Sequence, residues 1–265
     1  MNKPFFKTKI IALFLAAGIV VTSCSDDDSN NQRTTEITQQ EVLKNIKIEE
    51  ISNFIDGMTM NNLSLNRSNP SLFSKNVNND CFVFEATQNG YTLSFSECDL
   101  GDGIIVNGSM SVVVTVNDNA VTSTITFNNL NYGGNQINGT KSSIYSLNTT
   151  GGSLSYSVTS NLSINLADGS TASENGTKTY EIDGLGTAEA SYTISGSWNI
   201  TVNEDSYTLI ADPSLQGSFD CEYIKAGILT LTKNGLSAQV DYGDGTCDNK
   251  ATIIYPDGTE VEIEL

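Results

Sequence analysis

Hydrophobic and polar residues alternate in segment after segment from Cys81 to the end of the chain. Over 154–166 and again over 190–202, nearly every second residue is apolar and those between are Ser, Thr or Asn. This period of two places the apolar side chains on one face of a β-strand, which is typical of antiparallel sheets with one face in water. We therefore predict a mainly β fold, a long antiparallel meander that closes into a barrel-like, curled or sandwich sheet over residues 81–265.

Residues 37–60 follow a different period. Thr38 and Glu41 have the spacing of a capping box, and Ile48, Ile51 and Ile55 fall on one face at helical spacing. This pattern predicts one amphipathic helix packed on the apolar face of the sheet as a plug or lid; binding of a partner is the alternative. Residues 61–80, rich in Asn and Ser, are predicted to be an irregular connection.

The first residues have the features of a processing signal. A basic segment is followed by a short apolar run, so residues 1–23 are predicted to be a lipoprotein signal peptide. Val21-Thr22-Ser23-Cys24 resembles a bacterial lipobox, which implies a lipidated (palmitate-carrying) Cys24 and a membrane as partner. The alternative is an ordinary secretory peptide with a stray cysteine.

Residues 24–36 are predicted to be a disordered acidic linker. Asp26, Asp27 and Asp28 follow Cys24 and resemble the export signal of surface lipoproteins in Bacteroidota-type bacteria. That resemblance implies an outer-membrane lipoprotein exposed at the cell surface. A plain solvated linker, on a protein that faces the periplasm, is the alternative.

Four cysteines lie at the bases of two predicted hairpins. Asn89-Gly90 is a strong signal for a two-residue type I′ turn, and pairing outward from it sets Cys81 opposite Cys98 and Phe84 opposite Phe95. Non-hydrogen-bonded pairs approach closely enough for a disulfide, so we predict Cys81–Cys98.

The second hairpin, on Asn234-Gly235, pairs Lys233 with Leu236 but leaves its cysteines one residue out of register. One bulge in the first arm, at Gly227, would correct this and permit a Cys221–Cys247 disulfide.

Charge and composition exclude several functions. Lys+Arg 13 against Asp+Glu 31 gives a net charge of −18, which makes nucleic acid an unsuitable partner. The chain contains no histidine, so Ser-His-Asp and Cys-His pairs and histidine-ligated zinc are excluded. With no other catalytic motif, we predict that the protein is not an enzyme.

Two candidate sites for chemistry remain. Asp241, Asp244 and Asp248 could offer oxygens to Ca²⁺, although Asp-Gly is also ordinary turn chemistry; no other cofactor is predicted. Paired carboxylates, as in glycoside hydrolases, are the only acid–base groups left, and nothing singles out Asp220, Glu222 or Glu174 among them.

A sugar could stack on exposed aromatic residues. Trp198, however, lies on the apolar side of its strand, which favours core packing.

Short repeats and one longer motif carry a resemblance. Asn138-Gly-Thr-Lys141 recurs as Asn175-Gly-Thr-Lys178, and the chain ends with Asp241-Tyr-Gly-Asp-Gly-Thr-Cys-Asp-Asn249. Together with Cys24, these residues resemble a family of uncharacterised lipoproteins from Bacteroidota-type bacteria. The resemblance implies a location and an all-β fold, and it implies no activity, substrate or catalytic residue.

The sequence therefore predicts a lipid-anchored cell-envelope protein, a non-catalytic surface binding or adhesion module or a structural one, with a glycan or a protein as ligand. The alternatives are a carbohydrate-active enzyme that uses paired carboxylates and a calcium-stabilised glycan-binding module.

Overall fold

The computed structural model describes residues 36–63, 81–100, 103–117, 120–148, 153–184, 187 and 189–265, without the side chains of 58–63, 147 and 148. This part of the chain forms one helix, α1 (Gln39–Leu63), and thirteen strands. The strands are β1 (Phe82–Thr87), β2 (Gly90–Asp99), β3 (Ile105–Asn117), β4 (Ala120–Tyr132), β5 (Asn135–Asn148), β6 (Ser153–Asn165), β7 (Thr171–Asp183), β8 (Ser191–Val202), β9 (Asp205–Ser218), β10 (Ala226–Lys233), β11 (Leu236–Asp244), β12 (Lys250–Ile254) and β13 (Glu260–Glu264).

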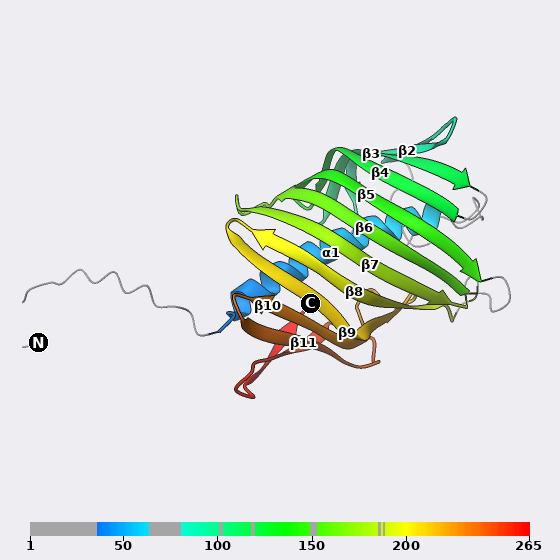
Figure 1. The fold of residues 1–265 in the computed structure, drawn as a ribbon. Helices are drawn as coiled ribbons and strands as arrows, with labels where there is room; N and C mark the ends of the chain where they lie inside the picture. Colours follow the sequence, from blue (N-terminus) through cyan, green and yellow to red (C-terminus); the bar gives the residue numbers. More distant parts are fainter. Residues whose placement is uncertain are drawn as a thin grey trace, which may run out of the picture. The chain divides into compact units, whose positions relative to one another are not determined.

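The strands form one antiparallel sheet in which each strand pairs with its neighbours in sequence order. The sheet is not closed, so β1 and β13 are its two edges. Figure 1 shows the sheet curled around α1, which lies against its concave face. The mainly β meander with an N-terminal helix is therefore confirmed, in its curled and open form.

The core lies between α1 and the concave face. Ile48, Ile51 and Ile55 of the helix have no exposed surface, and they face a layer of inward strand residues. The helix begins with the predicted capping box, because the Thr38 amide donates to Glu41 Oε2 (2.7 Å) and the Glu41 amide donates to Thr38 Oγ1 (3.3 Å). Within the described residues, no helix is both long and apolar enough to cross a membrane.

The first hairpin contains a correction. Thr87 pairs with Gly90, so the loop is Gln88-Asn89, and Phe84 pairs with Leu93 instead of with Phe95 as predicted. Gly90 permits β2 to lie very close to the neighbouring strand, because a Cβ at this position would lie 1.8 Å from the Val112 carbonyl oxygen.

The Cys81–Cys98 disulfide is present nevertheless, with the Cα atoms 5.1 Å apart. Ser96 is the residue that donates its amide to the Cys81 carbonyl (2.9 Å). A bulge with Glu97 at a φ of 49° then turns Cys98 into the core. The pairing was therefore predicted correctly from a register that was wrong.

The second hairpin follows its predicted turn. Asn234 and Gly235 both have positive φ (52° and 81°), and Lys233 pairs with Leu236. The strand pairing shifts at Gly227, but the extra residue lies in β11, because Ala226 pairs with Asp244 and Ile228 pairs with Asp241.

The prediction that the first arm carries the extra residue is therefore wrong. Two residues of β11, Tyr242 and Gly243, stand opposite Gly227, and both glycines have positive φ (92° for Gly243 and 103° for Gly227). Cys221 and Cys247 lie beyond this bulge and form the second disulfide, with a Cα–Cα distance of 5.8 Å.

The Asn-Gly-Thr-Lys repeats mark close contacts between strands. Gly139 and Gly176 have φ of 108° and 142°, a region that L side chains rarely adopt. A Cβ on Gly176 would lie 2.6 Å from the Trp198 Cα, and one on Gly139 would lie 2.2 Å from the Asn161 carbonyl oxygen. In each repeat the lysine two residues later is buried.

Two glycine-to-alanine substitutions should therefore have opposite effects. Gly176→Ala should lower the free energy of unfolding by at least about 2 kcal/mol, since it combines a strained φ with overpacking against Trp198. Gly57→Ala, in α1 with nothing within 4 Å of the added Cβ, should raise it by about 1 kcal/mol. Urea unfolding measures both; equal effects would contradict the packing described above.

Candidate functional site

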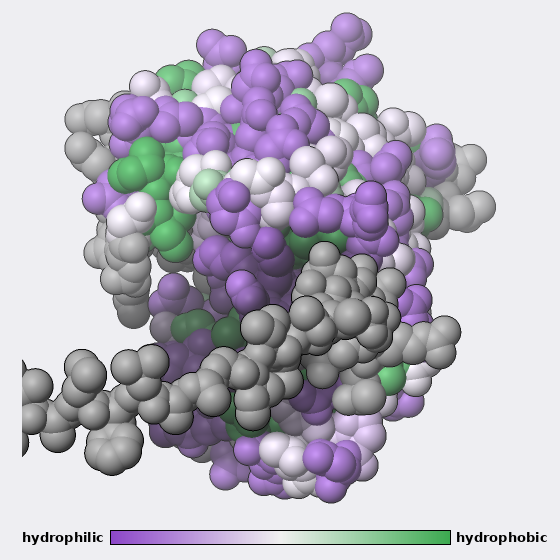
Figure 2. Space-filling view, turned by 90° about the vertical axis from the view of Figure 1, so that its left-hand side faces the viewer, coloured by the Kyte–Doolittle hydropathy of each residue, from purple (hydrophilic) through white to green (hydrophobic). Residues whose placement is uncertain are grey.

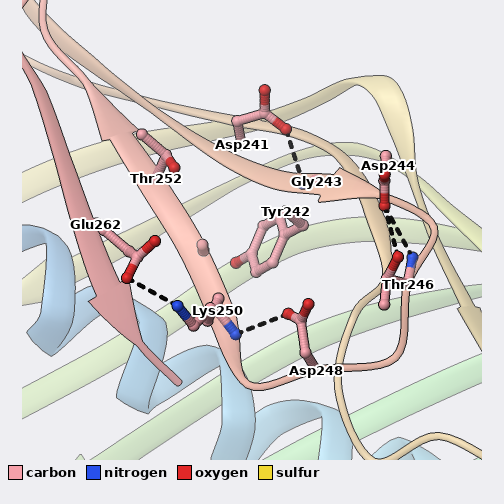
Figure 3. A pocket seen from close by; sticks show the side chains of 10 residues that line it. Asp241, Tyr242, Gly243, Asp244, Thr246, Asp248, Lys250, Thr252 and Glu262 are labelled. Carbon is pink, nitrogen blue, oxygen red and sulfur yellow. Dashed lines mark hydrogen bonds and ion pairs between the residues drawn. The ribbon is translucent and has the colours of Figure 1, made fainter.

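The predicted acidic site lies at the end of β11 and in the loop that follows it, and it lines a pocket of about 110 Å³ (Figure 3). Each carboxylate there accepts a hydrogen bond from the backbone amide two residues further on. Asp241 accepts from Gly243 (2.9 Å) and Asp248 from Lys250 (3.0 Å). Asp244 accepts from the Thr246 amide (3.2 Å) and hydroxyl (2.8 Å), and these bonds lower its pKa. These are turn-forming contacts.

Calcium gains no support from this arrangement. Within the described part of the chain, no three acidic or cysteine side chains come together as a metal site would require. The Lys250 ammonium also lines the pocket, where it pairs with Glu262 at 3.0 Å, and so places a positive charge among the carboxylates (Figure 3).

The acids considered for catalysis do not share a site. Glu174 has no exposed surface and lies beneath α1, whereas Asp220 and Glu222 are exposed on either side of Cys221, ahead of β10. Trp198 is 1% exposed, so its core packing is confirmed and sugar stacking on its ring is excluded.

A group of charged side chains is buried between α1 and the concave face of the sheet. We name it the α1 ion-pair cluster; it consists of Glu49, Ser52 and Asp56 of α1, Lys141 of β5, and Glu174 and Lys178 of β7. All six residues are buried. Charged side chains are rarely buried unless they are paired, so the partners of each decide what this cluster can do.

Lys141 has no exposed surface, and its three ammonium hydrogens match three acceptors on α1. Its Nζ donates to the Ser52 carbonyl oxygen (3.0 Å), to Ser52 Oγ (2.8 Å) and to Asp56 Oδ1 (2.7 Å). On the other side of the carboxyl, the Tyr180 hydroxyl donates to Asp56 Oδ2 (2.8 Å). Both oxygens of Asp56 are therefore bound by donors from the sheet.

Lys178 joins the two glutamates. Its Nζ lies 2.7 Å from Glu49 Oε2 and 3.6 Å from Glu174 Oε1, and it also lies 4.7 Å from the centre of the Trp198 ring. Burial alone would lower the pKa of Lys178, but the charges of Glu174 and Glu49 raise it above its ordinary value. The ammonium therefore stays charged in the core.

Ser52 connects these groups through its hydroxyl. Ser52 Oγ donates to Glu174 Oε1 (2.9 Å) and accepts from Lys141 (2.8 Å) and Lys178 (3.3 Å). One donor and two acceptors are the full capacity of a hydroxyl. The arrangement makes a continuous hydrogen-bonded path from the Lys141 ammonium to the Glu174 carboxylate.

The cluster contains three carboxyl groups and two ammonium groups, so it carries one excess negative charge when all are ionised. Burial raises the pKa of Glu49, and the neighbouring charge of Glu174 adds to this. Burial would also raise the pKa of Glu174, but Lys178 and Lys141 lower it. The Ser160 hydroxyl beside Glu174 also helps to lower its pKa.

A second ion pair fixes the first turn of α1. Glu41 Oε1 accepts hydrogen bonds from the Lys233 ammonium and from the Tyr207 hydroxyl (2.7 Å). Burial would raise the pKa of Glu41, but these bonds and those from Thr38 lower it to about 2. The first turn and the middle of the helix are therefore joined to the sheet by charge.

Sequence reasoning did not identify these residues as a group. The repeats that contain Lys141 and Lys178 were recognised, but their lysines were not assigned to the inner face. The alternation of β7 contains the missing signal, because Glu174 and Lys178 have the same parity as the buried Ala172, Tyr180 and Ile182.

Comparison with family models, with known proteins and with solved structures found no match for this chain. The resemblance based on Cys24, the repeats and the last motif therefore stays a prediction.

Removing one charge from the cluster should be far more damaging than removing one from the surface. Lys178→Met leaves Glu49 and Glu174 buried without their cation, so we expect it to lower the free energy of unfolding by about 3–5 kcal/mol. Lys250→Met, which removes an exposed pair with Glu262, should change it by about 0.5 kcal/mol or less. Urea denaturation compares the two; similar losses would show that the buried pairs do not hold α1.

Acid should weaken the start of α1. The pKa of Glu41 is about 2 in the fold against an ordinary value of 4.5, so its stabilising contribution is present above about pH 4.5 and is lost as the pH falls towards 2. Glu41→Gln should therefore be less stable than the unsubstituted chain at pH 7, and the difference should close by about pH 2. Thermal unfolding across this range measures it, with Glu260→Gln on the exposed edge strand as control.

Proposed function

We propose that the protein is a lipid-anchored cell-envelope module that does not catalyse a reaction on a substrate but binds an uncharged polysaccharide on the outer face of its sheet. The lipid anchor is Cys24, and the site of action is the outer surface of the outer membrane. The observation that carries the proposal is the composition of that outer face.

The outer face is almost free of charge. Strands β3, β4, β6 and β8 contain no charged residue at all, and the only one in β5 is the buried Lys141. In β7, Glu181 and Asp183 lie outward at the end of the strand. In a chain with a net charge of −18, this leaves a broad neutral surface across six neighbouring strands.

Ser, Thr and Asn cover this surface in rows that run across the strands. One row, given by the strand register, is Thr126, Thr140, Asn161, Asn175, Asn199 and Thr208. Neighbouring hydroxyls are hydrogen-bonded to one another in places, as between Thr159 and Thr177 (3.1 Å) and between Ser157 and Thr179 (3.2 Å). Short side chains held in this way lose little conformational entropy when they bind a ligand.

Hydrophobic side chains are too scattered to form a competing docking surface. Among the described residues of strands β3 to β8, the exposed large apolar side chains are Val113, Val116 and Ile144. Seen from the end at which α1 begins, hydrophobic residues form separate areas between hydrophilic and neutral ones (Figure 2). A partner that presents hydroxyl groups and no charge matches such a surface best.

The groups that could perform acid–base chemistry lie elsewhere. Glu49, Asp56 and Glu174 are buried under α1 in ion pairs, so a substrate in solution does not reach them. This arrangement supports a binding module over a carbohydrate-active enzyme.

One experiment on intact cells tests anchor and ligand together. Cells that carry the full chain should bind a labelled neutral glucan and should not bind a polyuronate of similar length. Cys24→Ala should abolish cell binding and release the chain from the membrane fraction. Combined Asn161→Ala, Asn175→Ala and Asn199→Ala should leave the chain on the cell and weaken glucan binding at least about tenfold, as expected for the loss of three hydrogen-bonding groups.

Glu260→Ala, on the edge strand β13, is the control and should change neither membrane attachment nor glucan binding. Binding that survives the triple substitution would contradict the outer-face assignment, and membrane retention of Cys24→Ala would contradict the anchor.

A further inference from the structure

We propose that Lys141 and Asp56 condense to form an intramolecular amide bond that permanently joins α1 to β5. The proposal rests on the geometry of the α1 ion-pair cluster and is independent of the function proposed above. An amine, a carboxyl group, a proton relay and a hydroxyl donor to the carboxyl lie together in a site that excludes water.

The two reacting groups are already in contact. Lys141 Nζ lies 2.7 Å from Asp56 Oδ1, and the two side chains are 0% and 3% exposed. Three hydrogen bonds hold the Lys141 nitrogen in this position, so the amine is already oriented next to the carboxyl group. Groups held in such contact react with effective molarities of about 10⁵ M or more.

The surroundings favour the neutral product over the ion pair. Burial penalises two separate charges, whereas an amide carries none and can keep the hydrogen bonds of its carbonyl oxygen. The neighbouring side chains are aromatic: Tyr156 and Tyr180 stack at 4.7 Å between ring centres, and the Tyr180 hydroxyl bonds Asp56 directly. This dry pocket removes the water that would otherwise favour the separated ions.

The protons can move without an outside reagent. One ammonium proton passes directly from Lys141 Nζ to Asp56 Oδ1, which leaves a neutral amine beside a carboxylic acid. The amine attacks Asp56 Cγ, and the charge that develops on Oδ2 is stabilised by the Tyr180 hydroxyl.

The second amine proton passes through Ser52 Oγ to Glu174, and it returns by way of Ser52 Oγ and the Lys141 nitrogen, which contacts both Ser52 Oγ and Asp56 Oδ1, to the departing Oδ1. The C–N bond forms, the Cγ–Oδ1 bond breaks, and one water molecule leaves. Net charge is unchanged, because an ammonium and a carboxylate become an amide and water. Glu174 is the carboxylate that Lys178 and Lys141 keep ionised, so it can accept this proton.

Lys178 lacks the same set of groups. Its contact with Glu174 is longer, at 3.6 Å, and the other oxygen of its partner Glu49 accepts a bond from the Trp198 indole and not from a hydroxyl. No described hydroxyl donates to Glu49 as Tyr180 does to Asp56. The reaction is therefore assigned to Lys141 alone.

Peptide mapping of the full chain purified from cells tests the proposal. After denaturation, reduction and proteolysis, we expect a branched peptide that joins the segment with Asp56 to the segment with Lys141 and is lighter than their sum by one water. Lys141→Arg, which keeps the charge but cannot form this bond, should give two separate peptides.

Ser52→Ala should slow formation of the bond at least about tenfold in a pulse–chase experiment, because it interrupts the relay. Ser123→Ala, a buried serine of β4 that contacts Tyr145 and lies outside the relay, should form the bond at the normal rate and controls for general damage to the core. Separate unmodified peptides from the unsubstituted chain, or a branch at Lys178 in place of Lys141, would overturn the proposal.

Discussion

The need to pair buried ammonium groups determines how this fold is assembled. Lys141 and Lys178 point from the sheet into its own concave side, where an uncompensated charge would cost several kcal/mol. Their partners come chiefly from α1, which contributes Glu49, Ser52 and Asp56. The helix therefore does more than cover the concave face of the sheet with apolar side chains. It supplies the anions without which the inner face could not be buried.

This dependence is mutual, and it fixes the position of the helix as well as its presence. Apolar contacts alone tolerate sliding or rotation, because hydrophobic burial is non-directional. Charged hydrogen bonds of 2.7 Å at Glu49 and Asp56 allow only one register, and the bond of Glu41 to Tyr207 fixes the start of the helix. An open sheet has no closing strand to define its curvature. Here the ion pairs along α1 set how tightly the sheet can curl.

The two edges of the open sheet are protected to different degrees. β13 is short and carries Glu260, Glu262 and Glu264, and such charges discourage pairing with another chain. β1 carries the exposed Val83 and Phe84 and is joined to β2 by the Cys81–Cys98 disulfide. The disulfide holds the end of this edge strand on its neighbour. The Cys81–Cys98 disulfide therefore fixes the rim of the sheet, and the contacts of the α1 ion-pair cluster fix its centre.

Much of the architecture could be read from the sequence because it depends on local rules. Strand alternation, the Thr38–Glu41 capping box and the Asn234-Gly235 turn each follow from residues near one another, and they gave the fold class, the start of the helix and one hairpin correctly. The register of the first hairpin was predicted wrongly because the position of Gly90 depends on its close contact with β3. The residues of the hairpin alone do not reveal that contact. Both disulfides were nevertheless predicted correctly. The bulge at Glu97 brings Cys98 to Cys81 in the first hairpin, whereas Cys221 and Cys247 meet outside the paired residues of β10 and β11.

The buried cluster escaped prediction for a related reason. Lysine and glutamate are normally solvated, so the inward parity of Glu174 and Lys178 in β7 was outweighed by their polarity. Only the joint arrangement of β5, β7 and α1 shows that the charges compensate one another. The same distribution describes the outer face: Lys141, Glu174 and Lys178 of β5 and β7 lie in the core, and apart from Glu181 and Asp183 at the end of β7, strands β3 to β8 carry no charge on the outside. The neutral exterior and the charged interior are two consequences of one distribution of residues, because these strands turn most of their few charges inward and offer chiefly uncharged polar groups to solvent or to a ligand.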